Sequence, residues 1–438
     1  MTIAVESQQT SYFTIAGDIP LDIAEGTLIS VTRNQPLKIY SLGFQPAKSI
    51  PEIPRWFLQK YLKSSSNILE PFAGSGTSII EALKHQIEVD WLDYHPLSRL
   101  ICSVKTTYFS AAEVLEQAEK IIESSAFYKQ APETVNFANK DFWFQKPVQE
   151  GLEILKELIL ASSLTTQPVL WLAFASTVRK TSNMNDGMLL AARRSHIKEI
   201  PQFSREDVFN YFKFYAEKAA DAISEWYNLV GDLRINARKL PWQNALDITG
   251  DCLYDAIVTS PPYINAIDYV WATKFELHWL NMVESDRDRL NLYANEIGTE
   301  RIPKVECKEL GKTNLKYLDR LIEDIYTGKK YQASKGQNQL RSRVAYKYFM
   351  DMKKHFIRSF ECLRSGGYYC FTIGDTSRIC GVDIPVASLL AEIACEVGFR
   401  KQFHFHLLLK NRKLNLPRNV DWAGTIKHDT IIVLEKAV

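Results

Sequence analysis

The chain has 438 residues, a hydrophobic fraction of 46% and a formal charge of only +2, from 53 basic and 51 acidic residues. This composition excludes a disordered chain, and the length favours either one large domain with insertions or two domains. The near-neutral charge means that any contact with nucleic acid must come from local clusters of basic residues. Seven scattered cysteines without metal-finger spacing predict reduced thiols and no metal site, and no signal or membrane-spanning segment is apparent.

The first elements in chain order are typical of an α/β protein. Residues 1–35 are weakly periodic, and we interpret them as an N-terminal arm or a peripheral pair of strands. The segment 36–109 then contains an amphipathic helix, a short strand at 67–70, a glycine-rich turn, a helix at 78–85 and a second strand at 87–93. Strand, glycine turn, helix and strand in this order indicate the opening of a doubly wound sheet.

The sheet is then interrupted. Segments within 110–230 repeat apolar residues every three or four positions, which predicts a large helical insertion. The sequence pattern of the sheet core returns at 231–283, with strands predicted at 233–237 and 254–259. Ligands of open α/β sheets bind at the carboxyl ends of strands, so the end of the second of these strands is a candidate site.

The remaining segments complete the expected fold. A second, polar insertion is expected at 284–338, and 339–438 forms the C-terminal part of the core. This last part is expected to contain a long helix that ends in a turn at 364–367, and an antiparallel pair at 399–409 and 430–434. We therefore expect an α/β fold with a doubly wound sheet, a C-terminal antiparallel hairpin, a large helical insertion and a second polar insertion.

The first candidate site is the glycine-rich turn after the strand at 67–70. It reads Leu69-Glu70-Pro71-Phe72-Ala73-Gly74-Ser75-Gly76-Thr77. Glycines between a strand and a helix let backbone amides approach a polar or anionic cofactor, and Asp93 ends the next strand, where a carboxylate can accept ribose hydroxyls. The turn lacks the lysine of a phosphate loop and the third glycine of a dinucleotide motif, which disfavours a polyphosphate ligand. An ordinary turn, with Asp93 capping the following helix, is the alternative.

The second candidate site ends the strand predicted at 254–259. It reads Thr259-Ser260-Pro261-Pro262-Tyr263. A serine hydroxyl and the carbonyl of a conformationally fixed diproline can accept the two hydrogens of an exocyclic amine and so localise the nitrogen lone pair, while the aromatic ring can stack on a base. The alternative is an ordinary Ser-Pro-Pro turn at the end of a strand.

Together the two segments resemble the motifs of S-adenosylmethionine-dependent DNA amino-methyltransferases, the N4-cytosine and N6-adenine enzymes of restriction–modification systems. Their cofactor motif is usually written with an acid, Pro, Phe and G-x-G-T, and Glu70 stands where aspartate is more usual. A family segment that packs on the methionine end of the cofactor is similar to residues 44–52. The resemblance implies a Rossmann-like class I methyltransferase sheet. It also implies that S-adenosyl-L-methionine is bound by Lys48, Ile50, Glu70, Pro71, Phe72, Ala73, Gly74, Ser75, Gly76, Thr77, Asp93, Asn236 and Thr259.

The resemblance further implies methyl transfer to a base flipped out of double-stranded DNA, with Ser260, Pro261, Pro262 and Tyr263 as catalytic residues. Serine before the diproline favours N4 of cytosine, because N6-adenine enzymes more often carry aspartate there; N6 of adenine stays open as the alternative. An RNA base methyltransferase and a catalytically inactive DNA-binding subunit rank lower. A cognate restriction endonuclease is a candidate partner, the oligomeric state is open, no membrane contact is expected, and the bacterial cytosol or nucleoid is the expected location.

The insertions at 110–230 and 284–338 are the candidate regions for DNA and target recognition, and two basic clusters are candidates for contact with DNA phosphates. One begins at Arg179 and flanks the polar loop that follows it, and the other, within 329–348, has three tyrosines interleaved. Mixtures of basic and aromatic residues suit phosphate contact and base stacking, although solvated helix faces are the alternative. The residues expected to bind DNA are Arg193, Arg194, Arg341, Arg343 and Lys347, with Tyr331, Tyr346 and Tyr348 as the interleaved aromatic residues.

Overall fold

The fold is described from a computed structural model. It describes residues 12–32, 36–46, 48–185, 200–231, 236–241, 244–250, 252–264, 267–334, 336–409 and 426–437. The DNA-binding candidates Arg193 and Arg194 lie outside these ranges. Within them, every helix is too short or too polar to cross a lipid bilayer.

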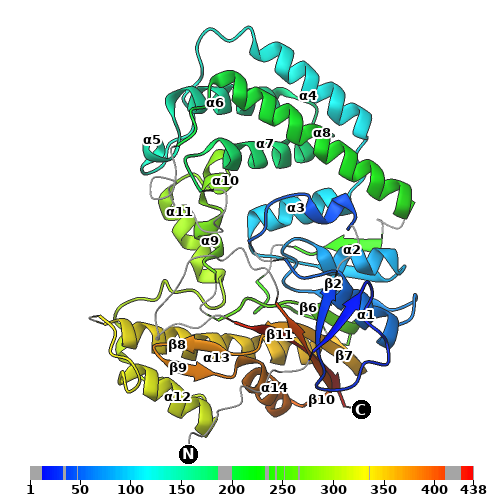
Figure 1. The fold of residues 1–438 in the computed structure, drawn as a ribbon, viewed down its shortest axis with the longest axis vertical. Coiled ribbons are helices and arrows are strands. Elements are labelled where there is room, and N and C mark those ends of the chain that lie inside the picture. Colours follow the sequence, from blue (N-terminus) through cyan, green and yellow to red (C-terminus); the bar gives the residue numbers. More distant parts are fainter. Residues whose placement is uncertain are drawn as a thin grey trace, which may run out of the picture.

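The centre of the described structure is a nine-stranded sheet with the order β1-β2-β10-β11-β7-β6-β3-β4-β5 (Figure 1). The strands are β1 (Phe13–Ala16), β2 (Leu28–Thr32), β3 (Asn67–Glu70), β4 (Glu88–Trp91), β5 (Ala237–Lys239), β6 (Tyr254–Thr259), β7 (Leu363–Gly374), β10 (Phe399–Leu408) and β11 (His428–Lys436). All neighbouring strands pair in parallel except β11, which is antiparallel to both β7 and β10. The expected α/β class with a large, mostly parallel sheet is confirmed.

Helices cover both faces of this sheet. One face carries α1 (Glu52–Tyr61), α2 (Thr77–Lys84) and α3 (Pro96–Thr106), and the other carries α13 (Gln337–Cys362) and α14 (Val386–Val397) (Figure 1). The central strands therefore have apolar residues on both faces: Ile68 and Val258 belong to one hydrophobic cluster, and Leu69 and Ile257 to another. Side chains alternate along a strand, so a continuous apolar run is what a strand covered on both sides requires.

The helical insertion forms a separate lobe at the top of Figure 1. Its helices are α4 (Ala111–Ser125), α5 (Lys140–Trp143), α6 (Lys146–Ala161), α7 (Gln167–Thr181) and α8 (Arg205–Val230). The indole N–H of Trp226 in α8 donates to the Lys105 carbonyl at 2.9 Å, which ties the lobe to the core. The short helices that follow β6 are α9 (Tyr269–Ala272), α10 (Lys274–Trp279) and α11 (Asp286–Asn291), and α12 (Lys316–Tyr326) then packs beside α13.

Two expected strand boundaries need correction. The third core strand is Ala237–Lys239 rather than 233–237, and β7 already begins at Leu363, so 364–367 belongs to a strand instead of a turn. The pairing of β7 with β6 changes register between Tyr254 and Ala256, which accommodates this early start. The N-terminal segment extends the main sheet through β1 and β2. A small hairpin, β8 (Ser377–Ile379) with β9 (Val382–Ile384), was not expected.

Candidate active site

The two sequence motifs meet at the carboxyl edge of the sheet. The glycine-rich turn follows β3 and the Ser-Pro-Pro-Tyr segment follows β6, and these two strands are hydrogen-bonded neighbours. The Thr259 hydroxyl at the end of β6 donates to the Glu70 carboxylate at the end of β3, with 2.5 Å between the oxygens. Residues 189 positions apart in the chain are thereby joined directly.

The glycine-rich turn has a backbone shape that its glycines permit. Gly74 and Gly76 have φ angles of +51° and +77°, in the left-handed region that side chains disfavour. A Cβ atom at Gly76 would lie 3.3 Å from the Cys102 sulfur, which is closer than ordinary contact. Gly76 also precedes the first residue of α2, so the backbone amides that open this helix face the end of the turn.

Glu70 is buried and directs its carboxylate into the protein. It accepts hydrogen bonds from the Phe72 amide at 3.0 Å and from the Thr259 hydroxyl. Burial raises the pKa of its carboxyl group to about 7. The acid of the motif therefore holds the turn and the neighbouring strand together. A direct contact between Glu70 and the cofactor stays a prediction.

Asp93, which follows the next strand, β4, binds the same turn. Its two carboxylate oxygens accept from the backbone amides of Gly74 and His95, each at 2.8 Å. Burial raises the pKa of this carboxyl group to about 6. The N-cap of α3 is His95, so Asp93 is not the cap itself. Each carboxylate oxygen has lone pairs beyond the single bond that it accepts, and these suit ribose hydroxyls.

Lys105 lies under the turn, and no motif in the sequence indicates it. It is 1% exposed, and its ammonium donates to the Ser75 carbonyl at 2.8 Å. Burial lowers the pKa of this lysine well below its ordinary value. The only sequence signal is its position on the apolar face of α3, together with Ile101 and Cys102, where a lysine is unusual.

In the loop that precedes α1, Lys48 binds backbone carbonyls. The Lys48 ammonium donates to the carbonyls of Tyr40 and Gly43, at 3.1 Å and 2.9 Å, and Ile50 is buried. Ala47 lies outside the described residues. Lys48 therefore supports the loop before α1, and its predicted contact with a cofactor is not tested by these bonds.

The Ser-Pro-Pro-Tyr segment is fixed by neighbours on both sides. The Ser260 hydroxyl donates to the Thr372 carbonyl at 3.3 Å, and the Pro262 carbonyl accepts from the Tyr348 hydroxyl at 3.0 Å. No described residue donates to the Pro261 carbonyl. The Pro261 carbonyl is thus a preorganised acceptor for a hydrogen-bond donor of a ligand, while the Pro262 carbonyl is already bonded within the protein.

Tyr263 is half-buried, with its hydroxyl toward Asp429. Burial and the Asp429 carboxylate, which accepts from this hydroxyl, raise the pKa of Tyr263 well above its ordinary value. Its ring lies against β7, where a Cβ atom at Gly374 would be 3.1 Å from the ring. Tyr348 and Asp429, which orient the diproline and the tyrosine, come from α13 and β11 and could not be recognised from the motif.

The structure corrects the placement of Asn236. Because β5 begins at Ala237 and runs parallel to β4, Asn236 lies at the amino end of its strand. Glu70, Asp93 and Thr259 lie at or beyond the carboxyl ends of theirs, at the opposite edge of the sheet. The expected contact between Asn236 and the adenine of the cofactor is therefore not supported by this position.

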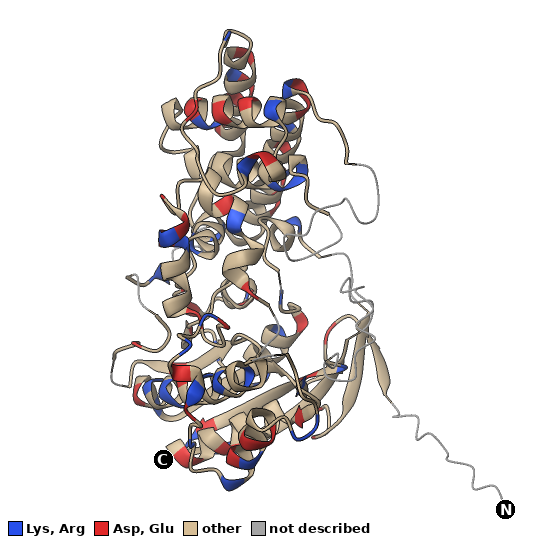
Figure 2. Cartoon of the chain, turned by 90° about the vertical axis from the view of Figure 1, so that its left-hand side faces the viewer, with Lys and Arg blue, Asp and Glu red and all other residues tan. Residues whose placement is uncertain are grey.

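The second basic cluster is largely matched by acidic residues. Arg341 pairs with Glu300, Arg343 lies 3.8 Å from Glu306 and 3.7 Å from Glu309, and Lys347 lies 2.6 Å from Asp351. Figure 2 shows basic and acidic residues interspersed over the surface of the helices. Contact between these residues and DNA stays a prediction.

Two residues of the basic clusters have structural roles instead. Tyr348 is fully buried and so cannot stack on a base, contrary to expectation. Arg179, at the start of the first cluster, pairs with buried Glu276 of α10 at 2.7 Å and lies over the Phe44 ring. It therefore joins the helical lobe to the segment after β6.

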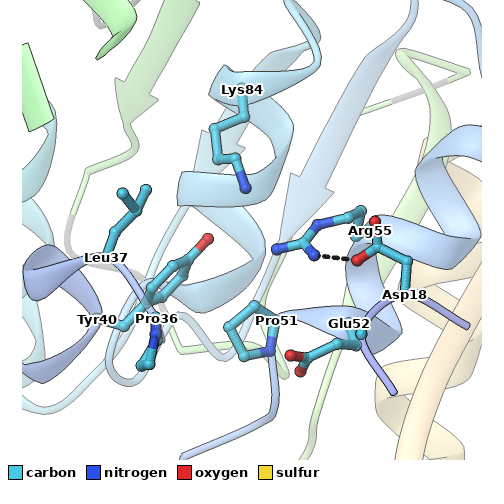
Figure 3. A pocket seen from close by; sticks show the side chains of 9 residues that line it. Asp18, Pro36, Leu37, Tyr40, Pro51, Glu52, Arg55 and Lys84 are labelled. Atoms are coloured by element: carbon cyan, nitrogen blue, oxygen red, sulfur yellow. Dashed lines mark hydrogen bonds and ion pairs between the residues drawn. The ribbon is translucent and has the colours of Figure 1, made fainter. Parts of the chain in front are cut away.

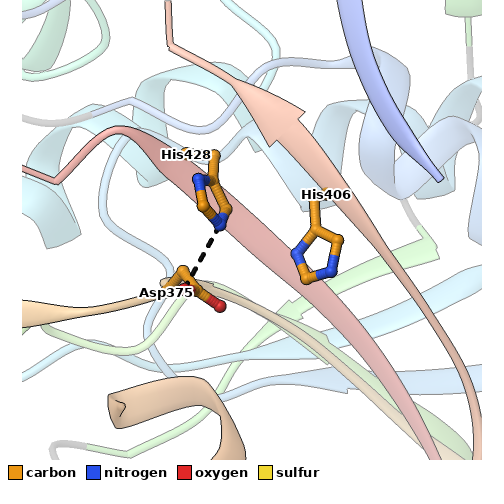
Figure 4. Close-up of side chains that lie close together, drawn as sticks. All are labelled: Asp375, His406 and His428. Atoms are coloured by element: carbon orange, nitrogen blue, oxygen red, sulfur yellow. Dashed lines mark ion pairs between the residues drawn. The ribbon is translucent and has the colours of Figure 1, made fainter. Parts of the chain in front are cut away.

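A cluster of possible metal ligands lies outside the two motifs. Asp375, His406 and His428 have ligand-type atoms within 4.8 Å of one another (Figure 4), although the sequence predicts no metal site. Thr430 donates to Asp375 at 2.8 Å and is 2.9 Å from His406, so hydrogen bonds within the protein account for this cluster.

A cavity of about 170 Å³ lies beside α1 (Figure 3). Arg55 crosses it from Asp18 to buried Glu81 of α2, and the Tyr40 hydroxyl also donates to Glu81. These ion pairs and hydrogen bonds connect the N-terminal segment to the core.

A mostly parallel sheet with a glycine turn after β3 and a Thr-Ser-Pro-Pro-Tyr segment after the adjacent β6 is consistent with a Rossmann-like methyltransferase. The relatives of the chain agree with this class. It is 22% identical to the type II methyltransferase M.MvaI of Kocuria varians, over 90% of each chain. It is 23% identical to M.AvaI of Nostoc sp., over 82% of this chain and 81% of the relative, and 23% identical to M.BsoBI of Geobacillus stearothermophilus, over 86% and 81%. No protein-family model matches. The relationship to type II methyltransferases that the motifs indicate is confirmed.

The elevated pKa of Glu70 predicts a pH effect on stability. A carboxyl group with a higher pKa in the folded state than in the unfolded state binds more protons when folded, so its contribution makes stability fall as the pH rises from about 4 to about 7. Glu70→Gln removes this contribution. We expect its free energy of unfolding to decline less over this range, by a difference on the order of 1–3 kcal/mol.

Urea unfolding at pH 5 and pH 8 measures this difference. Glu88→Gln, on the exposed first residue of β4, is the control and should keep the wild-type pH dependence. Equal declines in wild type and Glu70→Gln would show that Glu70 titrates normally.

Proposed function

We propose that the protein is a site-specific DNA methyltransferase that transfers a methyl group from S-adenosyl-L-methionine to the exocyclic N4 amine of a cytosine flipped out of double-stranded DNA. The observation that carries this proposal is the hydrogen bond between Thr259 and Glu70, because it joins the Ser-Pro-Pro-Tyr segment to the glycine-rich turn. Type II methyltransferase relatives along most of the chain support DNA as the substrate and a restriction endonuclease as a partner.

The residues at the edge of β3 and β4 fit this cofactor. The left-handed turn at Gly74 and Gly76 gives close access to backbone amides, and Asp93 has acceptor capacity for ribose hydroxyls. Buried Lys105 donates to the Ser75 carbonyl from beneath the turn and so holds the backbone of the turn in this shape. When bound, S-adenosyl-L-methionine supplies an electrophilic methyl group on a sulfonium.

The Ser-Pro-Pro-Tyr segment can bind and orient the amine. Because the Ser260 hydroxyl donates to the Thr372 carbonyl, its lone pairs remain for one amine hydrogen, and the Pro261 carbonyl can accept the other. Two acceptors on one nitrogen draw it toward tetrahedral geometry, so the lone pair leaves the ring and becomes nucleophilic. Tyr263 provides the face on which the flipped base stacks. After transfer, the methylated nitrogen carries a positive charge and releases one of its protons to solvent.

Methylated DNA tests the proposal directly. The protein is expressed in a host without modification enzymes, and host DNA is digested to nucleosides for mass spectrometry and sequenced for the modified positions. N4-methylcytosine at one sequence is the expected result. N6-methyladenine would overturn the assignment of cytosine, while unmodified DNA with a folded, cofactor-binding protein would overturn the proposed function.

A further inference from the structure

A second pocket lies beside the segment that follows the catalytic loop. It has a volume of about 330 Å³ and is formed between α5 of the helical lobe and the short helices α9, α10 and α11. Aromatic and cationic side chains dominate its wall. The lining residues that carry the argument are Phe142, Trp143, Trp271, Lys274, Asp286 and Arg289.

Lys274 is buried in this wall without an acidic partner. It is 7% exposed, and its ammonium lies 3.7 Å from the ring centroid of Trp271 and 3.9 Å from that of Trp143. No described residue accepts a hydrogen bond from this ammonium. Burial is the main cause that lowers its pKa to about 7. A lysine in such a place destabilises the fold unless an anion or another acceptor joins it.

A second cation has spare donor capacity in the same pocket. Arg289 is 7% exposed and pairs with Asp286 at 3.1 Å, but one of its terminal nitrogens has no partner within the described structure. Asp286 also accepts from the Ala138 amide at 3.0 Å and lies 3.5 Å from His278. Asp286 is the only carboxylate among the lining residues of the pocket, so the two cations Lys274 and Arg289 outnumber the acidic groups.

The pocket also offers faces for a flat ring. Phe142 is 44% exposed, and Trp271 is half-buried at the rim. Lysine or arginine beside exposed aromatic rings is the combination that binds a nucleotide, because the cations bind the phosphate and the rings stack on the base. The volume limits the occupant to about one nucleotide, since small-molecule pockets begin near 300 Å³.

The connection to the catalytic loop limits the distance between the pocket and the target base. Trp271 is eight residues after Tyr263, which limits their separation to at most about 28 Å. Asp268 caps α9 by accepting from the Trp271 amide at 2.7 Å, and the Tyr293 hydroxyl donates to it at 2.8 Å. The rim of the pocket is thus tied to the loop that begins with the catalytic motif.

We propose that this pocket binds a second nucleotide of the DNA strand, near the flipped target, with its phosphate against Lys274 and Arg289 and its base against Phe142 and Trp271. The inference rests on the proposed action on DNA and adds a site that reads or holds the strand outside the catalytic motif. A free nucleoside monophosphate has the same chemistry, and the test separates the two sources.

Lys274→Met keeps the aliphatic contacts and removes the charge. We expect weaker DNA binding, with a slope of log affinity against log salt that is smaller by about one unit, because one phosphate contact is lost. Cofactor affinity should stay unchanged, and the melting temperature should stay equal or rise. Wild-type affinity for DNA should also fall as the pH rises through about 7, and Lys274→Met should lose this dependence. DNA titrations at several salt concentrations and two pH values measure these effects.

Lys60→Met is the matched control. Lys60 also lies over aromatic rings, 4.5 Å from Phe403 and 5.2 Å from Trp56, but outside this pocket. It should leave the salt slope unchanged. A second variant, Phe142→Ala, removes an exposed ring and should lower DNA affinity without changing the slope.

Four outcomes test the proposed nucleotide site and the proposed function. A reduced slope in Lys274→Met alone supports the proposal, and a wild-type slope in Lys274→Met overturns it. Calorimetry with deoxycytidine monophosphate identifies the source: binding that Lys274→Met abolishes, with unchanged DNA binding, would overturn the DNA strand as the occupant. Absence of any DNA binding by the wild type would instead refute the proposed function.

Discussion

Ser260→Ala is expected to lower the rate of methyl transfer by about 100- to 1000-fold, the range seen when one preorganised hydrogen-bonding group is removed from a transition state. The variant loses one acceptor for the amine, so the nitrogen lone pair stays delocalised in the ring. The Thr372 carbonyl loses only a long hydrogen bond of 3.3 Å, so folding should be unaffected. Single-turnover kinetics with labelled cofactor measure the rate, and full activity would refute the assigned mechanism.

Tyr263→Ala tests the stacking of the flipped base separately from the activation of its amine. It removes the stacking face, so both the rate and the fluorescence of an extruded base analogue at the target position should fall. Ser260→Ala should keep that fluorescence, together with normal affinity for DNA. If both variants lose the signal equally, Ser260 contributes to flipping the base as well as to methyl transfer.

Gly74→Asp is expected to weaken binding of S-adenosylhomocysteine by about 100-fold or more, equivalent to about 2.7 kcal/mol. A side chain here would occupy the space through which the turn's backbone approaches the cofactor. The protein itself can accept it, since the nearest atoms to an added Cβ lie 3.6 Å and 3.7 Å away and aspartate tolerates left-handed φ angles. Calorimetry measures the affinity.

Gly336→Asp is the control for backbone strain. Gly336 has a φ of +79°, and no described atom lies within 4 Å of an added Cβ. It precedes α13, away from the turn, and should leave cofactor affinity unchanged. Wild-type affinity in a folded Gly74→Asp variant would show that the cofactor binds elsewhere.

The sequence predicts the strands that a local pattern of residues marks. The strands at 67–70 and 254–259 have the expected bounds, because short apolar runs with glycine or proline at their ends define where a covered strand stops. The third core strand was misplaced because β5 has only three residues and two of them, Arg238 and Lys239, are charged, so no apolar run marks it. The early start of β7 was missed because two glycines, Gly366 and Gly367, suggested a turn.

The supporting residues of the site could not be predicted, for a physical reason. Tyr348, Lys105 and Asp429 act through single contacts with the motifs, and each lies on a distant element whose packing decides where it points. A tyrosine in a long helix has the same local pattern whether it faces solvent or a carbonyl. In the same way, Asp375, His406 and His428 come together although no spacing in the sequence indicates a cluster.

The bond between Thr259 and Glu70 limits how such an enzyme can be re-engineered. If β6 and its loop were exchanged for those of a relative, the incoming strand would need a hydroxyl at its last position to satisfy a buried carboxyl group. Without that hydroxyl, Glu70 would lose a partner in a site from which water is excluded, and the glycine turn would lose its anchor. The segment proposed to bind the target base and the turn proposed to bind the cofactor therefore form one module, and they would have to be transplanted together.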